Sequence, residues 1–197
     1  SMDELVKERS VKSCIALGYQ HWQQHLSDTF RGTFMYLLIS AVMFTAALIS
    51  ALMGAPIWLS ITLLVVSLFD ISRKVRRISG EKETGKLGKR QIMRNLGYYL
   101  SFVCLSSVLR LCVICVISAP LLLLLYMYWL NYETMKAGDP SSLTTTYWVL
   151  IGLTAFDTSV AVRFIGTWTA YAELYVYGTM IARQQARKQA KATSLAS

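Results

Sequence analysis

The uncharged stretch between Gly32 and Phe69 restricts the fold of this chain more than any other feature. Soluble domains carry charge on roughly a quarter of their residues, so an uncharged stretch of this length needs lipid as its solvent. As one helix it would extend more than about 50 Å, against a hydrocarbon core of about 30 Å. The stretch therefore has to fold back. Gly54-Ala55-Pro56 is the best place, because glycine permits a tight turn and proline begins helices well. We predict a transmembrane hairpin over residues 33–71 with its turn at 54–56.

Two more apolar stretches predict a second hairpin. Between Asn95 and Tyr132 the one charged residue is Arg110, and the stretch from Thr144 to Ala182 carries three: Asp157, Arg163 and Glu173. Aromatic residues settle at membrane interfaces, and they flank a helix of spanning length in each stretch. We therefore predict transmembrane helices within 96–169, with an outer loop at 131–146. Arg110 falls about 28 Å before Trp129, at the opposite membrane face, so residues 95–109 either lie in the interface or extend the helix.

Basic residues are concentrated between the hairpins and at the C-terminal end. The loop at 72–95 contains Arg73, Lys74, Arg76, Arg77, Lys82, Lys86, Lys89, Arg90 and Arg94, and the tail contains Arg183, Arg187, Lys188 and Lys191. The 131–146 loop has one basic residue, Lys136. Because basic loops stay cytoplasmic, the 72–95 loop and both termini are predicted to be cytoplasmic. This topology accounts for most of the net charge of +9, so we expect no nucleic-acid partner.

The two ends of the chain are predicted to be helical as well. Within residues 1–32, apolar residues recur at steps of three or four: Val11, Ile15, Tyr19, Trp22, Leu26 and Phe30. That spacing predicts an amphipathic cytoplasmic helix lying in the membrane interface. Residues 170–197 are predicted to form a basic cytoplasmic helix and tail. The expected fold is thus an all-α integral membrane protein with four transmembrane helices as two hairpins, an N-terminal interfacial helix and a C-terminal helical extension.

Charged residues inside the predicted spans are candidate functional residues, because a charge at the bilayer centre costs a few kcal/mol. Asp157 lies about 15 Å from the outer aromatic residues, near the midplane. It could donate a hydrogen bond to Ser118, or to the Val116 carbonyl that Pro120 leaves without a helical donor. Asp70, Arg110 and Arg163 fall together in the inner half of the membrane. They form either an ion or proton path, or a structural set in which the arginines extend to the inner headgroups.

Two cysteines in the third span, Cys112-Val113-Ile114-Cys115, form a C-x-x-C pair. On a four-span chain this pair resembles the quinone-coupled thiol oxidases of the bacterial disulfide-forming route, which carry a similar Cys-Val-Leu-Cys. The resemblance implies a membrane thiol oxidoreductase with Cys112 and Cys115 as its redox pair. Those enzymes also have a cysteine pair in an outer loop, and residues 131–146 contain no cysteine. The alternative is that both thiols serve as small hydrophobic side chains.

His21 and His25 are four residues apart and share a helix face with Cys14. Three such ligands could hold zinc, although Trp22 takes the place of the general base in an H-E-x-x-H metalloprotease motif. The alternative is a polar border along an interfacial helix, and we expect no cofactor. Residues Ser79–Lys89 resemble a phosphate-binding loop in Gly80, Gly85 and Lys86, but Leu87 stands where Ser or Thr is required. That loop is predicted to be flexible and basic.

The first basic residues after the second span, Arg73, Lys74, Arg76 and Arg77, are predicted to face the lipid surface. Anionic headgroups attract such residues with about 1 kcal/mol each. The expected partners are the lipid bilayer and its anionic headgroups, together with a second copy of the chain or another membrane protein. Small residues in the first two spans, as in "ISAVMFTAALISALMGA", suit close helix packing or self-association.

The whole layout resembles small four-span membrane proteins of Bacteroides-type bacteria. The likeness is carried by the lead-in "LGYQHWQQHLSDTFRGTF", the basic loop between the hairpins and the ending "LYVYGTMIARQQARKQ". It implies the four-span topology and a bacterial cytoplasmic (inner) membrane, and it brings no activity or catalytic residues. We predict a non-enzymatic accessory, scaffold or assembly subunit with a basic cytoplasmic face. The alternatives are a small oligomeric transporter or channel that uses the intramembrane charges, and a membrane thiol oxidoreductase.

Overall fold

The computed structural model describes residues 2–78, 89–139 and 142–196, and these residues are helical or connect helices, with no strand among them. The prediction of an all-α fold is therefore confirmed. The helices are α1 (Met2–Leu5), α2 (Val11–Gln24), α3 (Leu26–Leu52), α4 (Ile57–Ser67), α5 (Ser72–Ile78), α6 (Lys89–Arg94), α7 (Leu96–Lys136), α8 (Thr145–Ile165) and α9 (Trp168–Ala196). Most of the predicted phosphate-loop-like segment, residues 79–88, lies outside the described residues.

Three helical stretches are long and apolar enough to cross a membrane. They are α3, α7 and the stretch Thr145–Leu195, which α8 and α9 make up. α7 is continuous from Leu96 to Lys136, so residues 96–109 belong to the same helix as the third predicted span. Large apolar side chains such as Ile57, Trp58 and Val116 are exposed on the helices. Exposed apolar surface of this extent marks a contact with lipid or with a partner.

The chain divides into two compact units. Unit 1 comprises residues 1–33, 71–110 and 166–197, and unit 2 comprises residues 34–70 and 111–165. Unit 1 thus collects both chain ends and the basic segment between the predicted hairpins. Unit 2 collects most of the apolar segments.

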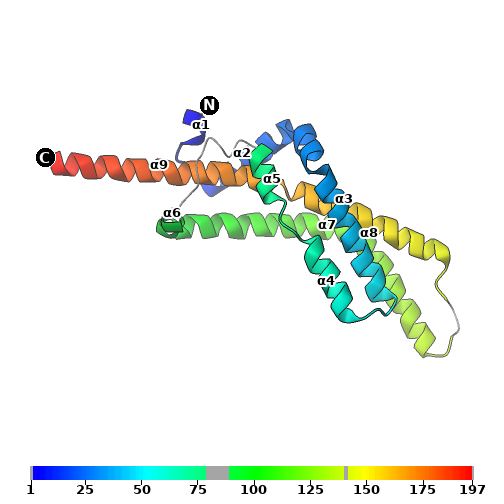
Figure 1. Cartoon of the computed structure of the whole chain (residues 1–197). Helices are drawn as coiled ribbons and strands as arrows, with labels where there is room; N and C mark the ends of the chain where they lie inside the picture. Colours follow the sequence, from blue (N-terminus) through cyan, green and yellow to red (C-terminus); the bar gives the residue numbers. More distant parts are fainter. Residues whose placement is uncertain (1, 79–88, 140–141, 197) are drawn as a thin grey trace. The chain divides into compact units, whose positions relative to one another are not determined.

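Unit 1 is built around α9, which α1, α2, α5 and α6 all contact (Figure 1). α2 begins at Ser10, whose side-chain oxygen accepts a hydrogen bond from the backbone N–H of Ser13 and so caps the helix. The backbones of α2 and α9 lie in close contact at Gly18. A Cβ atom there would lie 2.4 Å from the Cα atom of Ala172. The absence of a side chain at Gly18 is therefore what allows the two backbones to meet.

The face of α2 that packs against α9 differs from the predicted apolar face. The buried residues are Cys14, Gly18 and Trp22, and the Trp22 indole N–H donates a hydrogen bond to Thr167 Oγ1 over 2.8 Å. Tyr19, Leu26 and Phe30, from the predicted apolar set, are exposed instead. Gly18 lies where the two backbones meet, and Cys14 and Trp22 pack on either side of it along the helix. The apolar stripe is left free to face lipid.

Unit 2 has its core between α7 and α8, with the end of α3 packed against it. The buried residues are Leu121, Leu124, Tyr147, Ile151 and Ala155. Two tyrosine hydroxyls tie the helices together: Tyr147 donates to the carbonyl of Leu124, and Tyr128 donates to the carbonyl of Leu52, each over 2.7 Å. A buried tyrosine needs such a hydrogen-bond acceptor, and these two find it on the backbone of a neighbouring helix.

α4 is shorter than the predicted second span. The turn before it is where the sequence predicts it, with Gly54 at φ +78°. The helix then ends at Ser67 after 11 residues, or about 16 Å, instead of continuing to residue 71. Serine hydroxyls link α4 to α3: Ser40 donates to the carbonyl of Ser67 over 2.6 Å, and Ser50 and Ser60 lie 3.0 Å apart. Residues 68–71 are not helical.

Candidate functional site

Unit 1 contains a basic groove between α6 and α9, which five cationic side chains line. The groove encloses about 590 Å³. Its lining residues are Arg90, Gln91, Arg94, Asn95, Met180, Gln184, Arg187, Lys188 and Lys191. The α9 residues recur at steps of three or four from Met180 to Lys191, so they share one face of that helix. The α6 residues follow the same spacing, which places two short rows of cations along the groove.

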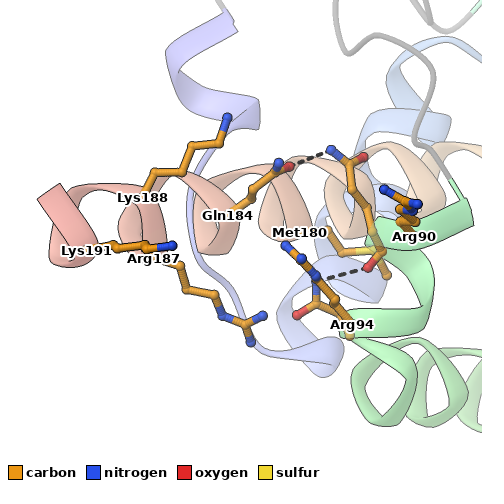
Figure 2. Close-up of a pocket in the computed structure, with 9 residues that line it drawn as sticks. Arg90, Arg94, Met180, Gln184, Arg187, Lys188 and Lys191 are labelled. Atoms are coloured by element: carbon orange, nitrogen blue, oxygen red, sulfur yellow. Dashed lines mark hydrogen bonds between the residues drawn. The ribbon is translucent and has the colours of Figure 1, made fainter.

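Polar contacts across the floor join the two walls of the groove. The side-chain amide N–H of Gln91 on α6 donates to the side-chain carbonyl oxygen of Gln184 on α9, and a dashed line at Gln184 marks this bond in Figure 2. Asn95 is buried and donates to the Gln91 carbonyl over 3.3 Å. Met180, which is 1% exposed, completes the floor. The Gln91–Gln184 hydrogen bond therefore links α6 to α9 at the floor of the groove.

The charge in this groove is uncompensated by any described residue. Arg90, Arg94, Arg187, Lys188 and Lys191 are all exposed, and none of the five forms an ion pair within the described part of the chain. By contrast Arg183, one turn before Arg187 on α9, pairs with Glu8 over 2.9 Å. Clustered like charges in a concave site raise the local concentration of counter-ions. The groove is therefore suited to bind an anion, with arginine forks able to hold a phosphate or carboxylate through two hydrogen bonds.

Among the described residues, the three predicted metal ligands are surrounded by hydroxyl groups and aromatic rings and not by further metal ligands. His21, His25 and Cys14 do share the side of α2 that faces α9. Within the described ranges, however, no three His, Cys, Asp or Glu side chains gather to hold a metal ion. The Cys14 sulfur lies 3.1 Å from the Tyr98 hydroxyl and 3.7 Å from Thr179 Oγ1, so hydroxyl groups take the place of the expected ligands.

The histidines instead belong to an aromatic cluster on α9. The Tyr175 hydroxyl is 3.3 Å from His21 Nδ1, and the Tyr171 ring packs edge-on against His21. His25 lies next to His21, with ring centres 4.7 Å apart. Burial, and next the charge of His25, lowers the pKa of His21 below its ordinary value of 6.5. The two imidazoles thus serve the α2–α9 contact, and His21 resists protonation there.

One of the four residues predicted to face lipid is engaged elsewhere. Arg76 on α5 forms a salt bridge with Glu173 on α9, with 2.5 Å between nitrogen and oxygen. Arg73, Lys74 and Arg77 are exposed on the same helix. Val75 points the other way and is fully buried, which attaches α5 to unit 1. Glu173, one of the few charges in the last apolar stretch, is therefore an interhelical partner for the basic loop.

The predicted intramembrane cluster is brought together only in part. Arg163 donates a hydrogen bond to the carbonyl of Phe69, immediately before Asp70 in the chain, and its guanidinium carbon lies 5.4 Å from the centre of the Phe69 ring. Arg163 thus reaches the residues that follow α4. Arg110 belongs to unit 1, and its side chain is exposed on α7.

The other predicted residues of the spans are exposed. Asp157 is exposed on α8, and the predicted hydrogen bond to Ser118 or to the carbonyl of Val116 is not formed. Cys112 and Cys115 are exposed on α7 as free thiols. The exposure of Asp157 follows from its position on the helix, because Ala155, Thr158 and Ser159 take the buried face of α8.

The groove was not predicted from the sequence, which assigns its five cations to the topology and to a general attraction of the loop and the tail for anionic lipid. The repeating pattern Gln184, Arg187, Lys188 and Lys191 is visible in the sequence as one polar helix face. What no local pattern shows is that residues 90–95 meet this face from a distant part of the chain. Comparison of the chain with protein-family models, with curated proteins and with solved structures finds no match.

Proposed function

We propose that this chain is a four-span protein of a bacterial cytoplasmic membrane and acts there as a non-enzymatic accessory, scaffold or assembly subunit. The observation that carries the proposal is the division of the chain into two units. Unit 1 contains the three segments assigned to the cytoplasm by their charge. Three of its four boundaries, at residues 33, 71 and 166, lie within four residues of the predicted span ends, and the fourth is at Arg110, the residue predicted to lie at the inner membrane face. Both termini and the basic loop then contribute to one cytoplasmic face.

The short helix α4 is compatible with a second crossing if the residues after it are included. An 11-residue helix extends about 16 Å, and residues 68–71, with about 3.3 Å each when extended, add roughly 13 Å. Non-helical backbone is tolerated in a membrane only where the protein satisfies its polar groups. Ser40 bonds the carbonyl of Ser67 and Arg163 bonds that of Phe69, which supports this arrangement.

An accessory role is supported by what unit 1 offers to other molecules. The α6–α9 groove presents exposed cations on helices that are fixed to each other by side-chain hydrogen bonds. Such a surface binds and orients an anionic group. Recognition of this kind is the requirement for a subunit that anchors or assembles others at a membrane.

Site-directed labelling tests the topology. The four native cysteines are replaced by serine, and single cysteines are introduced as Lys89→Cys and Lys136→Cys, both at exposed positions. A membrane-impermeant maleimide applied to whole spheroplasts should label position 136 and should label position 89 only after the membrane is opened. The reverse pattern would contradict the proposal. Purified protein in liposomes should show no ion flux by itself, and a flux would assign the chain to transport instead.

A second candidate, a small oligomeric transporter or channel, is favoured by the exposure of Asp157. This carboxyl group lies on α8 beside exposed Leu153, in an apolar helix of spanning length. A charge facing lipid is costly, so a second copy that covers it and forms a polar path would lower that cost. Asp157→Asn should then abolish flux in liposomes without changing the thermal midpoint. Equal flux in the variant and the wild type would remove this candidate.

A further inference from the structure

We propose that the α6–α9 groove is a binding site for the phosphate headgroup of an anionic phospholipid. The inference rests on the proposed function in one respect, since it requires unit 1 to lie at a membrane surface. It goes further because it assigns a ligand class to named residues. Five exposed cations surround the groove, and the described lining contains no carboxylate.

The chain next to the groove changes from charged to apolar over two residues. Arg94 ends α6, and Leu96 begins α7. Leu96 and Leu100 are 49% and 50% exposed, and Val103 continues the same side of the helix. Asn95, Phe102 and Ser106 form a different side, which is buried in unit 1. The first part of α7 is therefore amphipathic, with an exposed apolar stripe that begins at the cationic groove.

This order of charge and apolar surface matches that of a phospholipid. A helix with an apolar stripe and basic residues at its end lies in the membrane interface, with the stripe toward the acyl chains and the basic residues at headgroup depth. A phosphate held by Arg90 and Arg94 would then leave its acyl chains beside Leu96, Leu100 and Val103. An acidic protein segment would satisfy the cations equally well, but it would leave this apolar stripe uncovered.

The rigidity of the groove favours a specific site over diffuse attraction. Gln91 and Gln184 bridge its two walls, and the buried Asn95 and Met180 form its floor. Arg187, Lys188 and Lys191 on α9 line the groove together with Arg90 and Arg94 (Figure 2). A phosphate between the walls would meet cations from two helices that do not need to rearrange. Preorganisation of this kind reduces the entropic cost of binding.

Native mass spectrometry of the full-length protein in detergent tests the proposal, with phosphatidylglycerol as the probe and phosphatidylcholine as the neutral reference. The wild type should retain phosphatidylglycerol in preference to phosphatidylcholine at physiological ionic strength. The double variant Arg94→Gln/Arg187→Gln should weaken the retention about thirtyfold, the effect expected for two cations near a phosphate. Both positions are exposed, so the thermal midpoint should stay unchanged.

The matched control is Lys7→Gln/Lys12→Gln, which removes the same charge from exposed positions outside the groove and outside the predicted lipid-facing set. It should retain phosphatidylglycerol as the wild type does. An equal loss in both double variants would overturn the proposal in favour of diffuse attraction. Displacement of the lipid by millimolar inorganic phosphate would assign the groove to a free anion. Tighter binding of an oligoglutamate peptide than of phosphatidylglycerol would assign it to an acidic protein segment.

These results are separable from those that test the proposed function. Labelling of position 89 from outside the cell would refute the topology, whatever the lipid preference in detergent. Conversely, a groove variant that binds phosphatidylglycerol like the wild type would refute the headgroup site and leave the topology standing.

Discussion

The guanidinium group of Arg163 donates a hydrogen bond to the backbone carbonyl of Phe69 and lies over the ring of the same residue. Phe69 stands two residues beyond the last residue of α4, where the backbone has left the helix and its carbonyl has no helical donor. A cation at this place also complements the negative end of the helix dipole. The contact therefore makes Arg163 a cap for α4, and it gives this charge in an apolar helix a structural role.

Replacement of Arg163 should loosen the end of α4. Hydrogen bonds to charged groups contribute about 1.5–3 kcal/mol, so Arg163→Leu is expected to lower the free energy of unfolding by an amount in that range. Arg163→Lys keeps the charge but loses the planar fork, and it should restore part of the loss. Thermal unfolding in detergent, followed by circular dichroism, measures both variants. An unchanged midpoint in Arg163→Leu would show that the contact contributes nothing to stability.

Gly18 should tolerate no side chain, because the backbone of α9 lies directly against it. A methyl group there would lie 2.4 Å from the Ala172 Cα atom and 2.6 Å from its backbone nitrogen, and neither can move without shifting α9. Gly18→Ala is therefore expected to destabilise the protein by about 1–3 kcal/mol, as overpacked contacts do.

Two other helical glycines provide the controls for this prediction. The space around Gly97 is open, so Gly97→Ala should be neutral or stabilising by up to about 1 kcal/mol. At Gly32 the nearest atom is the end of the flexible Ile78 side chain, and the effect should be intermediate. Chemical denaturation of the three variants gives the order. A loss in Gly97→Ala as large as in Gly18→Ala would contradict the role of the close backbone contact.

Features of the fold that depend on residues close together in the chain can be predicted from the sequence, and features that depend on contacts between distant residues cannot. The helical spans and the turn at Gly54 follow from apolar runs and turn residues, which act locally. The face of α2 that packs on α9 was not predicted, because Cys14 and Gly18 are buried by the close approach to Ala172 and not by hydrophobicity. The residues after α4 are held by Arg163, about a hundred residues later in the chain. The groove depends in the same way on Gln91 meeting Gln184, a long-range pairing that periodicity does not encode.

Acid should destabilise unit 1 through His21. The folded state lowers the pKa of this imidazole below 6.5, so between 6.5 and the lower folded value the unfolded chain binds a proton that the folded chain does not. The free energy of unfolding should therefore fall as the pH decreases through this range and level off below it. Besides His25, the groups that face His21 are the Tyr171 ring and the Tyr175 hydroxyl. Because burial against α9 is the main cause of the lowered pKa, a variant that loosens this contact should also weaken the pH dependence of stability.

Thermal unfolding between pH 5 and pH 8 measures this effect. His21→Gln keeps a polar side chain that does not titrate, and it should reduce the loss of stability between pH 7 and pH 5. His25→Gln removes the second cause of the lowered pKa and should reduce the loss to a smaller extent. The same pH dependence in wild type and His21→Gln would place the acid-sensitive group elsewhere.

The Arg76–Glu173 salt bridge should couple the basic segment α5 to α9. Its side chains are 28% and 21% exposed, so solvent screens the pair less than a surface ion pair but still weakens it. We expect a coupling energy of about 1 kcal/mol from the double-mutant cycle of Arg76→Gln, Glu173→Gln and their combination. The losses of stability in the two single variants should add up to more than the loss in the double variant, because each single variant leaves one half-buried charge without its opposite.

Arg77→Gln, at the neighbouring exposed position, serves as the control for the salt bridge. It should change the free energy of unfolding by less than about 0.5 kcal/mol. Additive losses in the cycle would mean that the two charges act independently and that Val75 alone attaches α5 to unit 1.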